Sequence, residues 1–123
     1  MILVCRFAVA IAFAAASLPT RADDWTREDT YRQTVATALF LVDWGQTRYI
    51  IKHPEKFHEV SPALGAHPSM GRVNIYMGAH VIGHAAISYL LPPPWRKGWQ
   101  YVWIGLEANQ VRRNASVGIK IYL

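Results

Sequence analysis

The apolar run at residues 73–91 constrains the fold most, because it ends at three consecutive prolines, residues 92–94. Proline lacks a backbone N–H and its ring clashes with the preceding turn, so a helix formed by this run must end there. His80 and His84 lie within the run, four residues apart. A helix turns about 100° per residue, which puts both imidazoles on one face, about one turn apart. We therefore expect a helix that presents two ionisable rings together.

A second helix is expected over residues 26–51. Thr26, followed three residues later by Asp29, is typical of a hydroxyl N-cap with an acidic partner, the pattern of a capping box. The apolar centre of this helix, residues 35–42, is followed by polar side chains that share one face. These side chains are Asp43, Gln46 and Thr47. We expect this polar stripe to face the interior.

Residues 52–72 contain three prolines and two glycines, so we expect an ordered loop there. Beyond the three consecutive prolines, residues 99–111 suit a third helix, on which Gln100, Trp103 and Glu107 lie near one face. Residues 114–123 alternate between apolar and polar, which is strand periodicity. Because one short strand is not stable alone, we expect a short extended tail.

Composition favours a membrane setting. Hydrophobic residues make up 52% of the chain and charged residues 17%, against about a quarter charged in an average soluble domain. A mean hydropathy of only +0.08 shows that the apolar character is concentrated in segments. Aromatic residues bracket those segments, as interfacial anchors do. We therefore predict a mainly α fold, a small helical membrane bundle with an N-terminal signal or anchor, two to three helices and the extended tail. A secreted helical domain is the alternative.

The net charge of +5 suggests membrane lipid as a partner, through anionic headgroups. Nucleic acid is not expected, because no Lys/Arg cluster is interleaved with stacking aromatic residues. Ala79 and Gly83 form a small-x-x-x-small pair, which lets another helix approach closely. We therefore expect the histidine-bearing helix to pack against protein. This helix would then pack against a second copy of the chain in a homo-oligomer, or against a partner membrane protein.

Residues 1–22 have the composition of a signal peptide or a signal anchor. An apolar stretch at residues 2–18 is followed by Thr20 and Ala22, small residues that fit an export cleavage site after Ala22. Residues 23–123 would then form a single small helical domain. An uncleaved segment implies the bacterial inner membrane, and cleavage implies a periplasmic or secreted protein. The only cysteine, Cys5, lies in the apolar stretch, so no disulfide framework is expected.

The polar residues on the predicted helices suggest one site. His80 and His84, with Asp43 and Glu107 from other helices, would supply the nitrogen and oxygen ligands of a divalent metal such as zinc. The structural alternative is a polar cluster in which both histidines donate hydrogen bonds to Asp43, Gln46 or Thr47 and fix the helix register. The residues between the histidines include no Glu, so a zincin protease is excluded.

Two sequence strings resemble a known group of proteins. They are Asp43-x-x-Gln46-Thr47 and Glu59-x-x-Pro62-x-Leu64-Gly65-x-His67-Pro68, and a His-containing apolar helix follows them. This order is similar to a loosely defined group of small, uncharacterised membrane proteins of bacteria and their phages, which often have Asn at the position of Ser61. The resemblance spans about residues 35–89. It implies a helical membrane architecture and a bacterial origin, and it implies no activity.

No catalytic residue is predicted, because the serines lack a nucleophile elbow and no glycine-rich loop leads into a Lys-Ser/Thr helix start. The sequence therefore favours a small exported or inner-membrane protein with a structural or accessory role and an interhelical polar cluster. The alternative is a metal-binding or proton-coupled membrane protein that uses His80 and His84 with Asp43.

Overall fold

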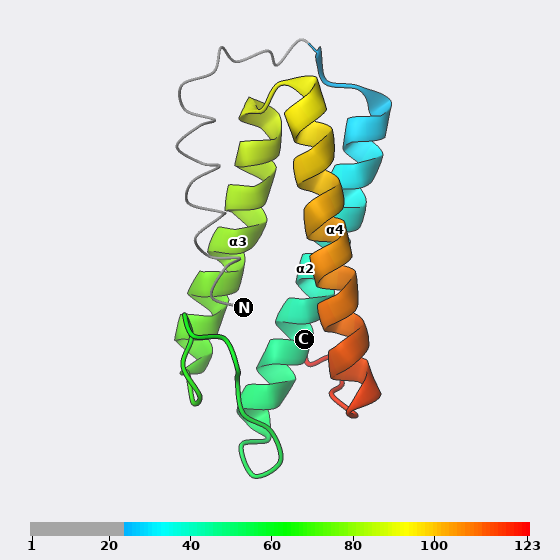
Figure 1. Cartoon of the computed structure of the whole chain (residues 1–123). Helices are drawn as coiled ribbons and strands as arrows, with labels where there is room; N and C mark the ends of the chain where they lie inside the picture. Colours follow the sequence, from blue (N-terminus) through cyan, green and yellow to red (C-terminus); the bar gives the residue numbers. More distant parts are fainter. Residues whose placement is uncertain (1–23) are drawn as a thin grey trace.

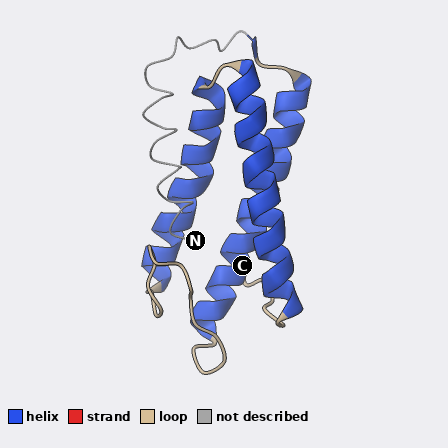
Figure 2. Cartoon of the chain, in the orientation of Figure 1, coloured by secondary structure: helices blue, strands red, loops and turns tan. Residues whose placement is uncertain are grey.

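The computed structural model describes residues 24–123, which form three helices arranged as an antiparallel bundle (Figures 1 and 2). The helices are α2 (Arg27–Lys52), α3 (Met70–Leu90) and α4 (Pro93–Ser116). Helix α2 packs extensively on α3 and α4, whereas α3 and α4 contact each other less. The predicted mainly α bundle is confirmed, and residues 24–123 contain no strand. The predicted signal or anchor, residues 1–22, lies outside the described residues.

Helix α2 begins as the sequence predicts. The Asp29 backbone N–H donates to Thr26 Oγ1 at 3.2 Å, and the Thr26 backbone N–H donates to Asp29 Oδ2 at 2.9 Å. This reciprocal capping box satisfies two amide groups that have no partner within the helix. The helix then runs to Lys52, one residue beyond the predicted end, and the loop expected after it spans residues 53–69.

The consecutive prolines both end α3 and begin α4. Leu91 leaves the helical conformation with a ψ of 140°, and the first two helical positions of α4 are both prolines. The first residues of a helix need no intrahelical N–H donor, so proline is favoured there. This is why α4 starts at Pro93 and the predicted helix over residues 99–111 was too short at both ends.

The C-terminal residues divide differently from the predicted alternation. Ala115 and Ser116 belong to α4, and residues 117–123 have no regular secondary structure. The tail returns to α2, where the Tyr122 backbone N–H donates to the Gly45 carbonyl oxygen at 2.9 Å. A Cβ atom on Gly45 would lie 2.6 Å from Ile121 Cγ2, so only glycine allows this close approach.

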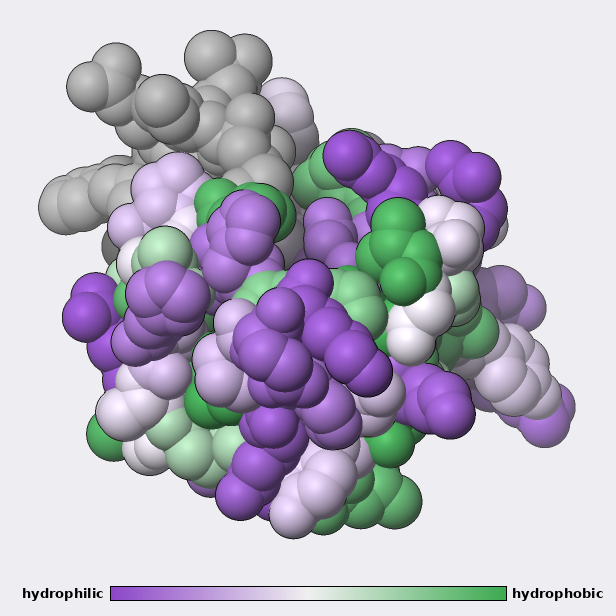
Figure 3. Space-filling view, turned by 90° about the horizontal axis from the view of Figure 1, so that it is seen from below, coloured by the Kyte–Doolittle hydropathy of each residue, from purple (hydrophilic) through white to green (hydrophobic). Residues whose placement is uncertain are grey.

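The interior of the bundle is polar at several positions. Asp29, Gln46, Thr47, His84, Arg96, Gln100, Glu107 and Asn114 are all buried, beside apolar residues such as Phe40 and Val73. The lower end of the bundle, seen from below in Figure 3, presents mostly hydrophilic residues with scattered hydrophobic ones. None of the helices in the described part of the chain combines the length and apolarity needed to cross a membrane.

Candidate functional site

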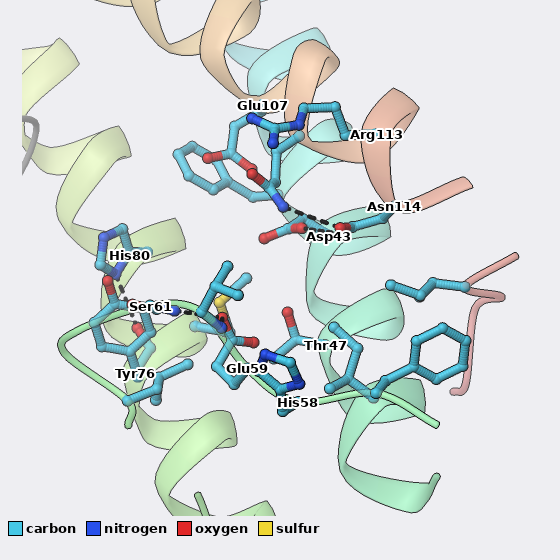
Figure 4. Close-up of a pocket in the computed structure, with 18 of the residues that line it drawn as sticks. Asp43, Thr47, His58, Glu59, Ser61, Tyr76, His80, Glu107, Arg113 and Asn114 are labelled. Carbon is cyan, nitrogen blue, oxygen red and sulfur yellow. Dashed lines mark hydrogen bonds between the residues drawn. The ribbon is translucent and has the colours of Figure 1, made fainter. Parts of the chain in front are cut away.

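A cavity of about 450 Å³ lies between α2, α4 and the loop that joins α2 to α3. Asp43 and Glu107 line it from α2 and α4, and Glu59 and His58 line it from the loop on the opposite side (Figure 4). His80 lies at the α3 side of the same cavity. We call this space the carboxyl cavity. Both strings that carry the family resemblance contribute residues to its wall, one from α2 and the other from the loop.

Asp43 is held by a chain of amide side chains at the lower end of α2 and α4. Asn114 Nδ2 donates to Asp43 Oδ1 and to Gln46 Oε1, each at 3.1 Å. Gln110 Nε2 donates to Asn114 Oδ1 at 3.0 Å, and Gln46 Nε2 donates to the Val111 carbonyl oxygen at 3.2 Å. These bonds fix the Asp43 carboxyl while leaving it at the cavity wall. Helices α2 and α4 are therefore joined by polar contacts at the base of the cavity.

The pKa of Asp43 lies closer to neutral pH than that of an ordinary aspartate. Burial and, to a smaller extent, the negative charge of Glu59 raise its pKa, the hydrogen bond from Asn114 lowers it, and the net result is a pKa of about 6. Asp43 is therefore largely ionised at pH 7 but takes up a proton under mildly acidic conditions.

Glu107 is more strongly perturbed. Its side chain is 9% exposed, and its Oε2 atom has no hydrogen-bond partner within residues 24–123. Burial and, to a smaller extent, the negative charge of Asp43 together raise the pKa of Glu107 to about 8. Glu107 therefore carries a proton at pH 7, beside an Asp43 carboxylate that does not. Neither carboxyl forms an ion pair with Lys or Arg in the described part of the chain.

The loop supplies a third carboxylate, which has a structural role of its own. Glu59 Oε1 accepts hydrogen bonds from the backbone N–H groups of Val60 and Ser61 at 3.0 and 2.8 Å. Gly65 has a φ of 81°, in the left-handed region that glycine adopts without steric cost. The loop is thus an ordered wall of the cavity. Lys56 and Arg113 also line the cavity, but both are exposed at its rim.

Neither histidine makes the hydrogen bonds that we expected with Asp43, Gln46 or Thr47. The Nδ1 atom of His80 lies 3.1 Å from the carbonyl oxygen of Tyr76, one turn earlier in α3. The Nδ1 atom of His84 lies 3.1 Å from Gln33 Nε2 on α2. The Phe40 ring lies near both histidines, with its centroid 6.4 Å from the His80 ring and 5.2 Å from the His84 ring.

The predicted ligand set is likewise divided. Asp43, Glu107 and His80 line the carboxyl cavity, whereas His84 lines only an adjoining aromatic pocket, to whose wall His80 also contributes. Within residues 24–123, no three His, Cys, Asp or Glu side chains are grouped closely enough to hold a metal ion. His80 and His84 face the interior of the bundle. No other helix in the described part of the chain covers the side of α3 on which Ala79 and Gly83 lie.

A second polar network, which the sequence did not predict, lies at the upper end of the bundle. Arg96 is fully buried, and its Nη1 atom donates to Asp29 Oδ2 at 3.1 Å. Arg32 also pairs with Asp29, and its Nε atom donates to Gln100 Oε1 at 2.9 Å. Burial acts to raise the pKa of Asp29, but hydrogen bonds from Thr26, Arg96 and Arg32 lower it below its ordinary value. The only sign of this network in the local sequence was Asp29, the acidic residue of the predicted capping box.

Comparison of the chain with protein-family models, curated proteins and solved structures gave no match. Function is therefore inferred from the site itself. The distinguishing property of the site is a pair of carboxyls, a partly buried, ionised Asp43 and a buried, protonated Glu107, on the wall of a cavity large enough for a small molecule.

Proposed function

We propose that this chain is a small accessory protein that binds a small organic cation, such as a protonated amine, in the carboxyl cavity. The observation that carries this proposal is the Glu107 Oε2 atom, which is buried at the cavity wall without a hydrogen-bond partner in residues 24–123. A buried polar atom without a partner is unfavourable, and a ligand N–H group would satisfy it.

Electrostatics favours a positively charged ligand over a neutral one. Asp43 already bears a negative charge at pH 7, and its Asn114 contact holds it in place. An ammonium group between Asp43 and Glu107 would stabilise the ionised form of both carboxyls. Glu107 would then release its proton, because the cation replaces the proton as the compensating charge. Binding is therefore linked to proton release.

The size of that release follows from the pKa of Glu107. With a pKa of about 8, roughly nine-tenths of Glu107 is protonated at pH 7 before binding. A cation that drives full ionisation of Glu107 therefore releases close to one proton per ligand. A ligand of the same shape without the charge releases none.

Calorimetry with benzylamine and benzyl alcohol tests the proposal. The full chain is titrated with each compound at pH 7 in phosphate and in Tris, whose different ionisation enthalpies report the number of protons released. We expect benzylamine to bind about tenfold more tightly or better, because a hydrogen bond to a charged group contributes about 1.5–3 kcal/mol. We also expect release of nearly one proton with benzylamine and none with benzyl alcohol.

Three variants locate the effect. Glu107→Gln should abolish proton release, and Asp43→Asn should weaken benzylamine binding while leaving the weak binding of benzyl alcohol unchanged. Glu55→Gln removes an exposed loop carboxylate outside the cavity and serves as the matched control. Equal affinities for the two compounds, or unchanged proton release in the Glu107→Gln variant, would show that the cavity does not recognise a cation in this way.

Cellular location is a second part of the proposal, and it depends on the composition of residues 1–22. We propose export to the bacterial inner membrane or across it. Mass spectrometry of the chain recovered from cell fractions separates the alternatives. A chain that begins at Asp23 in the periplasm or medium indicates cleavage, and an intact chain in the membrane fraction indicates an anchor. An intact chain in the cytosol would contradict export.

The outer face of α3 supports the proposal of an apolar partner. Ile75, Ile82 and Tyr89 follow one another at heptad spacing and are 77%, 73% and 51% exposed, with Ala79 and Ala86 exposed between them. Alternating three- and four-residue spacing is the pattern of a helix–helix seam. We propose that a second copy packs here. Light scattering of the full chain should show a dimer that Ile82→Glu dissociates, and a monomer that binds anionic lipid vesicles would indicate lipid contact instead.

A further inference from the structure

A second pocket adjoins the carboxyl cavity, lies between α3 and α4, and shares Phe40, Tyr76, His80 and Trp103 with it. It has a volume of about 270 Å³ and is lined by aromatic and aliphatic side chains, among them Phe40, Ile87, Trp99 and Trp103. His84 is the buried polar side chain on its wall, and it does not line the carboxyl cavity. We call this space the aromatic pocket.

The hydrogen bonds of His84 show which ring nitrogen carries the proton. Its Nδ1 atom lies 3.1 Å from Gln33 Nε2, and an amide nitrogen is only a donor, so Nδ1 accepts. The proton of the neutral ring is therefore on Nε2. Burial lowers the pKa of His84 to about 4, and the nearby His80 acts in the same direction, so the ring is neutral at pH 7.

The Nε2–H group of His84 has no acceptor in the described part of the chain. His84 is 3% exposed, and its Nε2 atom has no hydrogen-bond partner within residues 24–123. Trp99 Nε1, a donor at the same wall, is already used, because it donates to the His84 carbonyl oxygen at 3.4 Å. A buried donor without an acceptor is unfavourable in an apolar setting, and it favours a ligand that brings one acceptor atom.

The surrounding rings favour a flat ligand. Trp99 stacks on His84 with ring centroids 5.4 Å apart and an angle of 17° between the ring planes. Trp103 stands edge-on to Trp99, at 5.5 Å and 66°. Aromatic rings in these orientations offer both a face and an edge to another planar group. The opening is made by small residues, since Ala79 is exposed and a Cβ atom on Gly83 would contact nothing within 4 Å.

We propose that the aromatic pocket binds a flat, uncharged apolar molecule with one carbonyl oxygen, which accepts the hydrogen bond of His84 Nε2 while its ring lies against Trp99 and Trp103. This ligand class differs from the organic cation proposed for the carboxyl cavity. The two proposals can therefore fail independently.

A matched pair of ligands isolates the hydrogen bond. We would titrate the full, isotope-labelled chain with 2-acetylnaphthalene and with 2-ethylnaphthalene, which have similar shapes but differ in the carbonyl oxygen. Binding is followed by the indole N–H signals of the tryptophans in NMR spectra. We expect the ketone to bind about tenfold more tightly than the hydrocarbon, the gain typical of satisfying one buried donor. Equal affinities would overturn the proposal.

Substitutions test the place of binding. His84→Phe keeps a stacked ring and removes the donor, so the ketone should lose its advantage while the hydrocarbon binds as before. Gly83→Leu fills the opening without changing His84 and should weaken binding of both ligands. Gly105→Leu is the matched control, because Gly105 is an exposed α4 glycine outside the pocket with nothing within 4 Å of its Cβ position.

Each outcome decides the proposal. A ketone preference that persists in the folded His84→Phe variant would assign the hydrogen bond to another residue and overturn it. If that variant does not fold, the comparison of Gly83→Leu with Gly105→Leu decides the location. Equal effects of these two leucines on ligand binding would place the ligand outside the aromatic pocket.

Discussion

We expect the wild-type protein to lose stability as the pH rises from about 5 to about 9. Replacing Glu107 by Gln should remove most of that loss. The folded state holds the Glu107 proton up to a pH of about 8, whereas an ordinary glutamate releases it near 4.5. Between these values the folded protein binds more protons than the unfolded chain. Stability therefore falls as the pH rises through this window, and it is greatest below the lower value.

The magnitude follows from the two pKa values. Each pKa unit corresponds to about 1.4 kcal/mol, so the window from 4.5 to about 8 sets an upper limit of about 5 kcal/mol on the loss. Water entry and side-chain movement around an ionised Glu107 reduce this figure, so we expect about 2–4 kcal/mol. The glutamine side chain of the Glu107→Gln variant has nearly the same shape and no ionisable proton.

Urea unfolding of the full chain, followed by tryptophan fluorescence at about pH 5, 7 and 9, measures this loss. The Glu107→Gln variant should have a nearly constant free energy of unfolding between pH 7 and 9, where the wild type continues to lose stability. Glu55→Gln, an exposed loop substitution, should behave as the wild type. A Glu107→Gln variant that loses as much stability as the wild type would refute the argument that burial keeps Glu107 protonated.

Three further substitutions test the packing, the first two by the change in the urea midpoint. Arg96→Met should cost about 1.5–3 kcal/mol, because it removes the interhelical charge-assisted hydrogen bond to the buried Asp29 carboxylate, which keeps its pairing with Arg32. Thr26→Ala should cost about 1 kcal/mol through loss of the capping box. Gly45→Ala should displace the tail, because its Cβ would lie 2.6 Å from Ile121 Cγ2, and faster proteolysis of the last residues would show this. An unaltered cleavage rate would contradict that contact.

Local signals in the sequence predicted the helices well. Thr26 and Asp29 specify the start of α2 through bonds between residues three apart, and the consecutive prolines specify the end of α3 by sterics alone. The start of α4 was missed because the prolines were interpreted only as a stop. Proline ends a preceding helix and is also favoured at the first positions of the next.

The interhelical partners could not be predicted, because they depend on the rotation and tilt of whole helices. A shared face for His80 and His84 follows from their spacing, but the partner of His84 is Gln33 and not Asp43. Gln33 lies ten residues before Asp43 in α2, so the level at which α2 meets α3 decides the partner, and no pattern in the sequence gives that level. Likewise, Arg96 pairs with Asp29, which lies 67 residues away in the chain. Local sequence rules apply only to residues a few positions apart, so they could not predict this pair.

Polar contacts join α2 and α4 above and below the residues at which the two cavities meet. Helices α2 and α4 are joined at the upper end through Asp29 and Arg96 and at the lower end through Gln46 and Asn114. The carboxyl cavity and the aromatic pocket share four lining side chains, Phe40, Tyr76, His80 and Trp103. Because a ligand in either space would contact these shared side chains, a ligand in one cavity should alter affinity at the other. Titrating benzylamine in the presence of 2-acetylnaphthalene would reveal this effect.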